Sequence, residues 1–475
     1  MTQINASTVT TTVALAFLLS FTGAATLYAD STMPSSIPSP LQAVAPPLGN
    51  GITALSLDHD AYANIGRLQA FDIADFPLSE DRQVDLHVRR IDVFSVDAQV
   101  VIGSGKGDQP LLARPDVVLL SGEVVGVPGS IVFLGLSPHG THGYIQFPDE
   151  MFIISTRAGK TVIYSLTALP EGLLTLPDFQ CDVIEVVDRF DADVQRNQTA
   201  NGTSAQCRVV DIAIETDWEF TQVFGGDTEA SSAYVTILLG AASEIYSRDV
   251  FTTLKIVFLR VWAENNDPWN GGGLSEFVNF WNANMTHVQR DVAHFLSGRP
   301  GGGVAYLPGV CQEGFDYGYS SGMNGFFPYP LEHNNSQNWD IIVVCHELGH
   351  NFGSPHTHDY VPPIDECGLG QCENAENGTL MSYCHTCPGG LANFRLEFHP
   401  IVVETMLNYL ANDAPCDTLA DPADLDCDGS VGVKDLLILL GNWGPCADCA
   451  DCIADLDGEC SVGVKDLLIL LGNWG

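Results

Sequence analysis

The stretch HELGHNFGSPH, at residues 346–356, constrains this chain more than any other part of its sequence. Apolar residues before and within it predict a helix, which Gly353 can end in a left-handed conformation. Residues four apart lie one turn apart on the same helix face, so His346 and His350 can bind a single metal ion. The turn at Gly353 brings His356 back as a third ligand. The spacing therefore predicts a helix that ends beside a three-histidine metal site.

The chemistry expected at such a site is hydrolysis. Zinc in catalytic sites takes three protein ligands, keeps one position for water, and lowers the pKa of that water toward neutrality. Glu347 follows the first histidine and can accept the proton before passing it to a leaving amine. We predict that His346, His350 and His356 hold zinc and that Glu347 acts as general base and then acid. A helix with ordinary surface histidines is the alternative, which the length of the pattern disfavours.

Length and charge limit the classes of partner. At 475 residues the chain has room for about three domains. Asp and Glu number 59 against 19 Lys and Arg, and the net charge of −40 opposes binding to nucleic acid and to anionic membranes. An acidic surface adapted to solubility or salt, with no partner implied, is an equally open interpretation.

The N-terminus and the cysteines indicate a secreted protein. The apolar run VALAFLLSF, followed by small residues as far as Ala29, predicts a signal peptide over residues 1–29. No Lys or Arg precedes the run, so an uncleaved anchor is the alternative, although the run is short for a membrane span. The 14 cysteines fit disulfides formed in an oxidising compartment. We expect a protein that is secreted to the extracellular space or associated with the cell surface. We expect no membrane span in the mature chain.

The remaining chain divides into four predicted segments. Residues 30–187 contain short β-branched runs separated by Gly, Pro, Asp and Ser, which predicts a β-rich domain. Residues 188–206 are polar and read as a linker that a processing protease can reach. Residues 207–412 alternate between strand and helix patterns, which predicts an α/β (α+β) domain. Residues 413–475 contain two near-identical copies of one segment at a period of 31 residues and form a separate module.

The motif resembles the zinc-binding consensus of the metzincin zinc endopeptidases, and Met381 in NGTLMSY stands where that group has a methionine turn beneath the zinc. Within the group, residues 207–412 are most similar to adamalysin or reprolysin-like proteases, particularly secreted bacterial relatives. The resemblance implies a mixed sheet, an active-site helix, and a protein or peptide substrate. The segment GGGVAYL is expected to be the edge strand that pairs with an extended substrate. Thr357 departs from the adamalysin pattern, which usually has Asp there.

Other residues near the motif have less certain roles. The sequence Met381-Ser382-Tyr383 is closer to astacins and serralysins, where the tyrosine can approach the zinc, so Tyr383 is a candidate electrophilic helper. A packed turn aromatic is the alternative. We expect His358 and His385 to be surface residues or supports for the ligands, and not ligands themselves.

Two cysteines bear on the site. The region before Cys207 resembles the propeptide of the same proteases, in which a cysteine can occupy the open position of the zinc. Cys181 is therefore a candidate latency switch, and a disulfide, for instance to Cys207, is the alternative. Cys345 points about 100° away from its neighbour on the helix, which predicts a disulfide or a buried thiol.

The repeated tail segments have the spacing of EF-hand-type calcium loops, with oxygen-bearing residues at positions 1, 3, 5, 7 and 12. The candidate calcium ligands are Asp424, Asp426, Asp428, Ser430 and Asp435 in the first copy and Asp455, Asp457, Glu459, Ser461 and Asp466 in the second. Gly429 stands at the turn position of the first loop, and Cys460 replaces it in the second. The copies resemble dockerin type I repeats, which implies a small α-helical module with a cohesin-like partner. A calcium-stapled tail without a partner is the alternative. We expect Cys446, Cys449 and Cys452 to form disulfides.

These observations predict a secreted zinc-dependent endopeptidase that is made as a zymogen, with zinc and calcium as cofactors. A catalytically weak or dead scaffold, whose dockerin-like tail is the working part, is the alternative of a different class. The intact Glu347 speaks against it. A zinc hydrolase acting on something other than protein is a third interpretation, which the edge-strand sequence disfavours.

Overall fold

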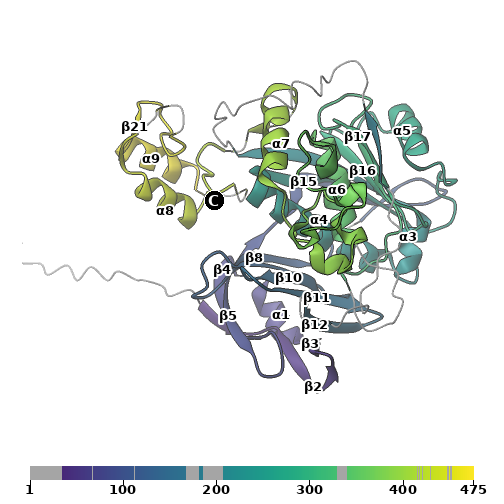
Figure 1. The fold of residues 1–475 in the computed structure, drawn as a ribbon, viewed down its shortest axis with the longest axis horizontal. Coiled ribbons are helices and arrows are strands. Elements are labelled where there is room, and N and C mark those ends of the chain that lie inside the picture. The colour runs from purple at the N-terminus through teal and green to yellow at the C-terminus, as the bar shows by residue number, and fades with distance from the viewer. Residues whose placement is uncertain are drawn as a thin grey trace, which may run out of the picture.

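The computed structural model describes most of the chain (Figure 1). The described residues are 35–66, 68–111, 113–166, 169, 181–185, 207–328, 340–414, 416, 418–419, 421–427, 429, 431–446, 449, 452–474. The predicted signal peptide at 1–29 and the predicted linker at 188–206 lie outside them. Within the described residues no helix combines the length and apolar character that crossing a membrane requires.

The first sheet, here called the N-terminal sheet, lies within residues 35–165 and is mainly antiparallel. Its strands run in the order β1-β4-β5-β8-β9-β10-β11-β12-β3-β2. Their bounds are β1 (Ser35–Pro38), β2 (Leu41–Gly49), β3 (Ile52–Leu57), β4 (Ala70–Pro77), β5 (Gln83–Ile91), β8 (Val118–Val124), β9 (Ile131–Leu136), β10 (His142–Gln146), β11 (Met151–Arg157) and β12 (Lys160–Ser165). Helix α1 (His59–Ile65) contributes Tyr62 and Ile65 to its core. The β-rich character that the short runs predict is confirmed, and the role of a propeptide stays a prediction.

The second sheet, here called the central sheet, is mixed, as expected. Its order is β13-β17-β18-β16-β14-β15-β6-β7, and β19 pairs with β14. The bounds are β6 (Phe94–Gly103), β7 (Gln109–Pro110), β13 (Cys181–Glu185), β14 (Arg208–Thr216), β15 (Thr252–Trp262), β16 (Val292–Leu296), β17 (Gly303–Leu307), β18 (Tyr317–Ser320) and β19 (Thr418–Leu419). Three of these strands, β6, β7 and β13, precede residue 207. The predicted boundary therefore cuts through the sheet, because periodicity does not show which sheet a strand joins.

Helix α4 (Thr228–Val250) lies between the two sheets. Its start is capped by Asp227, whose carboxylate accepts hydrogen bonds from two backbone N–H groups, and every residue from Ser231 to Ser243 is buried. On the side of the N-terminal sheet, Ile237 packs so closely on Gly135 of β9 that a Cβ on the glycine would lie 2.4 Å from the Ile237 side chain. Burial on more than one face explains why the helix is apolar all round.

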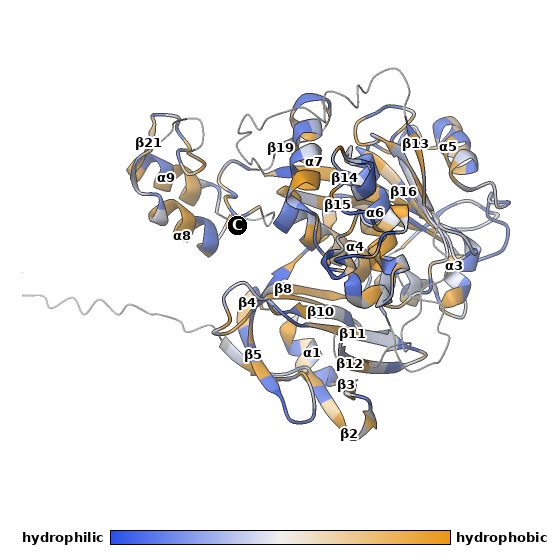
Figure 2. Ribbon diagram, viewed as in Figure 1, coloured by the Kyte–Doolittle hydropathy of each residue, from blue (hydrophilic) through white to orange (hydrophobic). Residues whose placement is uncertain are grey.

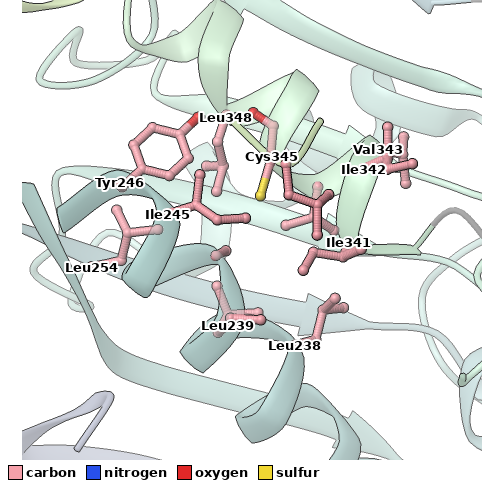
Figure 3. Close-up of a cluster of buried hydrophobic side chains, with 14 of the residues drawn as sticks. Leu238, Leu239, Ile245, Tyr246, Leu254, Ile341, Ile342, Val343, Cys345 and Leu348 are labelled. Atoms are coloured by element: carbon pink, nitrogen blue, oxygen red, sulfur yellow. Dashed lines mark hydrogen bonds between the residues drawn. The ribbon is translucent and has the colours of Figure 1, made fainter. Parts of the chain in front are cut away.

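Six other helices of the described residues complete the fold around the central sheet and in the tail. Their bounds are α3 (Trp218–Val223), α5 (Gly273–Asn284), α6 (Asp340–Asn351), α7 (Pro400–Asn412), α8 (Val433–Gly441) and α9 (Val464–Gly472), of which the last two belong to the tail. Figure 3 shows the core where α4 meets α6, with Leu238 and Ile245 near Cys345. Cys345 is fully buried as a thiol, which agrees with one of its two predicted states, and burial raises its pKa.

The tail is a compact unit with two short strands, β20 (Gly444–Pro445) and β21 (Ser461–Val462), beside α8 and α9. Both helices are largely hydrophobic in sequence (Figure 2). Their inward residues, which include Leu439 and Leu470, form a small core.

Six disulfides join described residues. They are Cys207–Cys427, Cys311–Cys416, Cys367–Cys384, Cys372–Cys387, Cys446–Cys452 and Cys449–Cys460. The prediction of disulfides for the three clustered tail cysteines is confirmed. The suggested pairing of Cys181 with Cys207 is wrong, because Cys207 bonds to the tail and Cys181 remains a thiol.

Candidate metal centre and active site

Helix α6 presents the motif on the side opposite its core contacts. Val344 and Leu348 pack into the interior, and Asp340 anchors the first turn by accepting hydrogen bonds from the Tyr234 hydroxyl at 2.8 Å and from the N–H of Asn324. Burial raises the pKa of Asp340 to about 6. At the other end Gly353 adopts φ +91°, the left-handed turn that the sequence predicts.

The three histidines converge on one point. The Nε2 atom of His350 lies 3.2 Å from Nε2 of His346 and 3.2 Å from Nε2 of His356. The Nδ1 atoms face the other way: His346 contacts the Leu380 carbonyl at 2.7 Å, and His350 contacts the Ser354 carbonyl at 2.7 Å. A carbonyl only accepts hydrogen bonds, so Nδ1 of these two rings carries the proton and Nε2 is left with its lone pair. Burial lowers the pKa of both rings, which keeps them neutral.

This donor set fits zinc. Two nitrogen ligands about 2.1 Å from a zinc ion in tetrahedral geometry are about 3.4 Å apart, close to the separations found here. The ring of His356 is oriented in the same manner, since its Nδ1 lies 3.2 Å from the Asp359 carboxylate. A carboxylate or carbonyl behind each ligating imidazole is the arrangement that holds metal-bound histidines in place.

Met381 lies beneath the helix, where the sequence placed it. It is fully buried, and a Cβ on Gly349 would meet its sulfur at 2.4 Å. Its carbonyl accepts a hydrogen bond from the N–H of Thr357 at 3.0 Å. Because the preceding residue, Leu380, holds His346, this turn fixes the ligands from below.

Glu347 is fully buried and lies against strand β17. A Cβ on Gly303, the first residue of that strand, would lie 1.8 Å from the Glu347 carboxylate. Only a glycine leaves room for the acid beside the three histidines. The expectation that this segment is an edge strand needs correction, because β13 pairs with the outer side of β17. Sequence reasoning also missed this role of Gly303, for which the Gly301-Gly302-Gly303 run is the only local signal.

Tyr383 reaches the same point from the segment after Met381. Its hydroxyl lies 3.2 Å from Nε2 of His356 and donates a hydrogen bond to the Cys181 carbonyl at 3.2 Å. Burial raises its pKa, so the phenol stays protonated. His358 stacks on the His356 ring at 5.1 Å, outside the histidine cluster. His385 is buried, not at the surface, and its ring lies 5.8 Å from that of Tyr383.

Cys181 completes the cluster. Its sulfur lies 3.4 Å from Nε2 of His350, and it groups with all three histidines within 4.8 Å. A zinc ion that bound both a thiolate and an imidazole would place them about 3.6 Å apart. Strand β13 carries this cysteine and pairs in parallel with β17, from Cys181 opposite Gly303 to Glu185 opposite Leu307. The edge expected to receive substrate is thus occupied by this strand.

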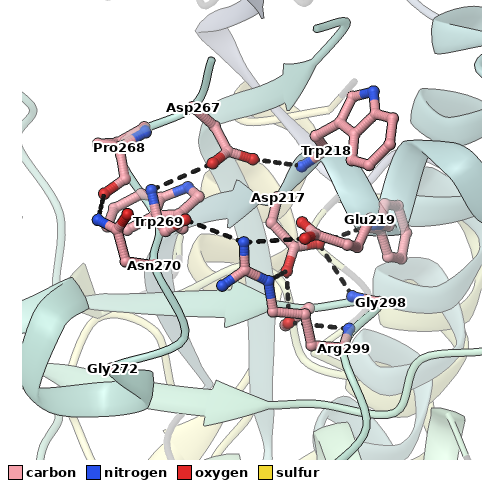
Figure 4. A network of polar contacts seen from close by, with 12 residues as sticks. Asp217, Trp218, Glu219, Asp267, Pro268, Trp269, Asn270, Gly272, Gly298 and Arg299 are labelled. Atoms are coloured by element: carbon pink, nitrogen blue, oxygen red, sulfur yellow. Dashed lines mark hydrogen bonds and ion pairs between the residues drawn. The ribbon is translucent and has the colours of Figure 1, made fainter. Parts of the chain in front are cut away.

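A buried polar network holds the loop that leads into β17 (Figure 4). The Asp217 carboxylate accepts hydrogen bonds from the Gly298 N–H at 2.9 Å and the Ser297 hydroxyl at 2.5 Å. Arg299 pairs with Glu219 at 2.9 Å. Burial raises the pKa of Asp217 to about 6. Sequence reasoning missed this network. It holds the loop before β17 and so helps to position β17 beside the site.

The tail loops are only partly described. Asp424, Asp426 and Asp435 bring carboxylate oxygens within 4.8 Å of one another, whereas Asp428 and Ser430 lie outside the described residues. Gly429 adopts the left-handed conformation (φ +84°) expected at the turn position.

In the second loop Cys460 takes over that conformation with φ +64°. Its N–H donates to the Asp455 carboxylate at 2.6 Å. Asp466 accepts hydrogen bonds from the N–H groups of residues 456 and 457, and Lys465 pairs with Asp457 at 3.0 Å and also with Glu459. The exposed Lys465 ammonium therefore lies at the second loop, as Lys434 lies at the first, 3.5 Å from Asp426. Ser461, the remaining candidate, begins β21 and contacts Glu459.

Comparison with known proteins agrees with the geometry of the histidine cluster. Residues 206–395 match the Reprolysin_5 family, described as metallo-peptidase family M12. The chain is 23% identical over 254 residues to disintegrin and metalloproteinase domain-containing protein 1 of Rattus norvegicus, covering 50% of this chain and 30% of that protein. It is 24% identical over 175 residues to zinc metalloproteinase-disintegrin-like brevilysin H2a of Gloydius brevicauda, covering 35% of this chain and 38% of that protein. The comparisons support an adamalysin-like metzincin domain.

The mixed α/β fold of the central sheet fits such a protease domain. The chain spans less than two fifths of the length of these two relatives. Metalloproteinase II from Bacteroides fragilis is a looser structural likeness, with 13% identity and a TM-score of 0.39 over 74% of this chain and 95% of that one. That likeness is too weak to carry an argument.

Proposed function

We propose that this chain is a secreted zinc-dependent endopeptidase, of the bacterial secreted type, that is made as an inactive precursor. The observation that carries the proposal is the convergence of three imidazoles beside the buried Glu347 and strand β17. Family M12 resemblance over residues 206–395 and the disulfides support a secreted protease domain.

In the proposed mechanism His346, His350 and His356 would hold zinc, which would supply Lewis-acid polarisation of water and of the substrate carbonyl. Glu347 takes a proton from the attacking water and delivers it to the leaving amine. The Tyr383 hydroxyl, protonated and next to His356, can donate to the developing oxyanion. Strand β17 binds the substrate backbone in an extended form.

Latency is assigned to Cys181. Its thiol contacts the histidine cluster, and its strand covers β17, so neither water nor substrate can take its productive position. Residues 30–187 would thus serve as a propeptide and residues 207–412 as the protease domain, with processing in 188–206.

The test uses the full chain with unfolded protein as substrate. Once this chain is cut within 188–206, so that β13 can leave β17, Cys181→Ala should raise cleavage, and a zinc chelator should abolish it until zinc is restored. Adding Glu347→Gln to Cys181→Ala should lower kcat by about 100-fold or more, the usual contribution of a general base. The matched control is Glu229→Gln, which removes an exposed carboxylate at the start of α4. Cleavage unchanged by both the chelator and Glu347→Gln would refute the mechanism.

We also propose that the tail is a calcium-binding, dockerin-like docking module for a cohesin-like partner. The supporting observation is an exposed apolar face on each repeat: Val433 and Val464 are both 63% exposed, and Leu437 and Leu468 are 62% and 63% exposed. Calcium titration of the full chain, followed by tail fluorescence from Trp443 and Trp474, should saturate. A matched titration of Asp424→Asn with Asp435→Asn should lose the first transition. A flat response in the unaltered chain would contradict the calcium assignment.

If a folded, zinc-loaded Cys181→Ala chain that has been cut within 188–206 cleaves no protein, the alternative of a scaffold whose tail is the working part is favoured instead. The two proposals are separable, because the calcium titration does not depend on catalysis.

A further inference from the structure

We propose that residues 35–166, here called the N-terminal domain, are a lasting subunit of the enzyme that stays bound after the chain is cut between 188 and 206. Activation then requires only the release of β13, the strand with Cys181. This deepens the proposed precursor function and rests on it for the meaning of activation, whereas the binding itself does not.

The first support is a strand that the N-terminal domain adds to the central sheet, at the end opposite β13. Strand β6 of the N-terminal domain pairs in parallel with β15, from Gln99 opposite Phe258 to Gly103 opposite Trp262. Strand β15 is buried along nearly all its length. Without β6 its outer backbone groups would lose their partners, and an exposed apolar edge strand is prone to aggregate. The protease sheet is therefore complete only with a strand from the N-terminal domain.

The second support is a buried charge that the N-terminal domain helps to satisfy. The Arg260 side chain is 4% exposed and pairs with the fully buried Glu215 at 2.6 Å. Asp108, on the loop between β6 and β7, approaches the other side of the guanidinium at 3.2 Å. Loss of Asp108 would leave a nearly buried cation with fewer acceptors, which is unfavourable.

The third support is the second face of α4. Leu119 of β8 packs on Gly240, where a Cβ would lie 2.7 Å from the leucine side chain, and Ile237 packs on Gly135 in the same manner. Departure of the N-terminal domain would expose this apolar helix face to water. Apolar burial of this kind contributes about 25 cal/mol per Å².

Buried hydrogen bonds add to this contact. The hydroxyls of Ser155 and Tyr164 donate to the carbonyls of Phe327 and Pro328, each at 2.7 Å. These carbonyls belong to the segment that precedes α6, so the N-terminal domain also supports the approach to the active-site helix.

Strand β13 is attached to the central sheet by a much smaller contact than the N-terminal domain is. It is a single strand of five residues at the opposite edge of the sheet, and Ile184 within it is 39% exposed. The two attachments use opposite edges of the central sheet, so β13 can leave while β6 remains.

The experiment inserts a recognition sequence for a site-specific protease between residues 190 and 204 of the full chain, in the Cys181→Ala background. After cutting, size-exclusion chromatography is run in native buffer. We expect both fragments in one peak, and cleavage of unfolded protein by that peak. The sequence from 35 to 166 contains no cysteine, so a shared peak cannot arise from a disulfide.

A variant series keeps the result interpretable. Asp108→Ala should raise the Kd between the cut fragments about tenfold, the loss expected for one partner of a buried charge. Asp97→Ala, an exposed carboxylate on β6, is the matched control and should leave the Kd unchanged. Separate peaks for the unaltered cut chain would overturn the inference. A shared peak without proteolysis would leave the inference standing and count against the proposed function.

Discussion

At the scale of single residues, the candidate site depends on a glycine, which has no side chain. Glu347 fits beside the histidines only because Gly303 has no Cβ. The glycine lies on another element, 44 residues earlier in the chain, and its role comes from close packing between β17 and α6. The geometry of the candidate site is therefore set partly by the missing Cβ of Gly303.

We predict that Gly303→Ala lowers kcat/KM of the Cys181→Ala protease by about 100-fold, because the methyl group displaces the Glu347 carboxylate by an ångström or more. Steady-state kinetics on a peptide substrate checks this. The control Gly441→Ala adds a methyl group that meets nothing within 4 Å and should leave the kinetics unchanged. Equal kcat/KM in both variants would show that Glu347 tolerates the crowding.

The residues of the candidate site differ in how far the sequence alone could predict their positions. The positions of His346, His350 and Glu347 follow from helix geometry over five residues, so local spacing was sufficient. The proximity of Gly303 and Cys181 to the cluster depends on which strands meet, and no local pattern specifies that. The resemblance to protease propeptides identified Cys181 as a candidate latency switch. It left open a disulfide of Cys181 as the alternative, which the structure contradicts.

At the scale of elements, β10 of the N-terminal domain places an unusual group against the protease domain. His142 is buried, and its Nδ1 accepts a hydrogen bond from the Phe327 N–H at 3.3 Å. Its ring also packs edge-on against Tyr234 of α4 at 5.2 Å. Burial lowers its pKa to about 3 from the ordinary 6.5.

The lowered pKa of His142 determines the direction in which the free energy of unfolding changes with pH. Between pH 6.5 and about 3 the unfolded chain binds a proton at His142 that the folded chain does not, so the free energy of unfolding falls as the pH drops. One such group contributes at most about 1.4 kcal/mol per pH unit. We predict that His142→Gln flattens this slope, as measured by denaturant unfolding at pH 7, 6, 5 and 4.

The matched control is His59→Gln on α1, where the histidine is exposed, and the slope should persist. His294, whose pKa burial also lowers to about 3, contributes a similar slope in both variants. If His142→Gln and His59→Gln gave the same slope, His142 would not be neutral in the folded chain.

Element prediction succeeded for helical segments such as α4 and α6, and failed in assigning strands to sheets. Strands β6 and β13 have the same alternating or apolar pattern as their neighbours, yet they cross to the central sheet. Strand alternation records that one face is buried and says nothing about the partner.

At the scale of the whole molecule, two disulfides, Cys207–Cys427 and Cys311–Cys416, join the tail to the protease domain besides the backbone. Cys207, directly before β14, bonds to Cys427 inside the first tail loop. The carbonyl of Cys427 also accepts hydrogen bonds from the hydroxyls of Ser247 and, at 3.1 Å, Thr253. The first loop is thereby seated on the protease domain.

We predict that the double variant Cys207→Ser with Cys427→Ser lowers the free energy of unfolding by about 2–5 kcal/mol, since the bond links residues 220 apart. Scanning calorimetry should show the tail unfolding separately from the protease domain. Cys446→Ser with Cys452→Ser, which opens a bond spanning 6 residues within the tail, is the control and should leave the two parts coupled. Identical calorimetric profiles for both double variants would contradict this.

The same bond decides where mechanical load would enter the enzyme. Strand β14 has hydrogen-bonded neighbours on both sides, β15 and β16, and Cys207 precedes it directly. If the tail were held by an immobile partner while substrate or flow pulled on the protease, the force would pass through Cys427 into the middle of the sheet. Helix α7, the last helix before the tail, would be spared, and the sheet would resist the pull in shear.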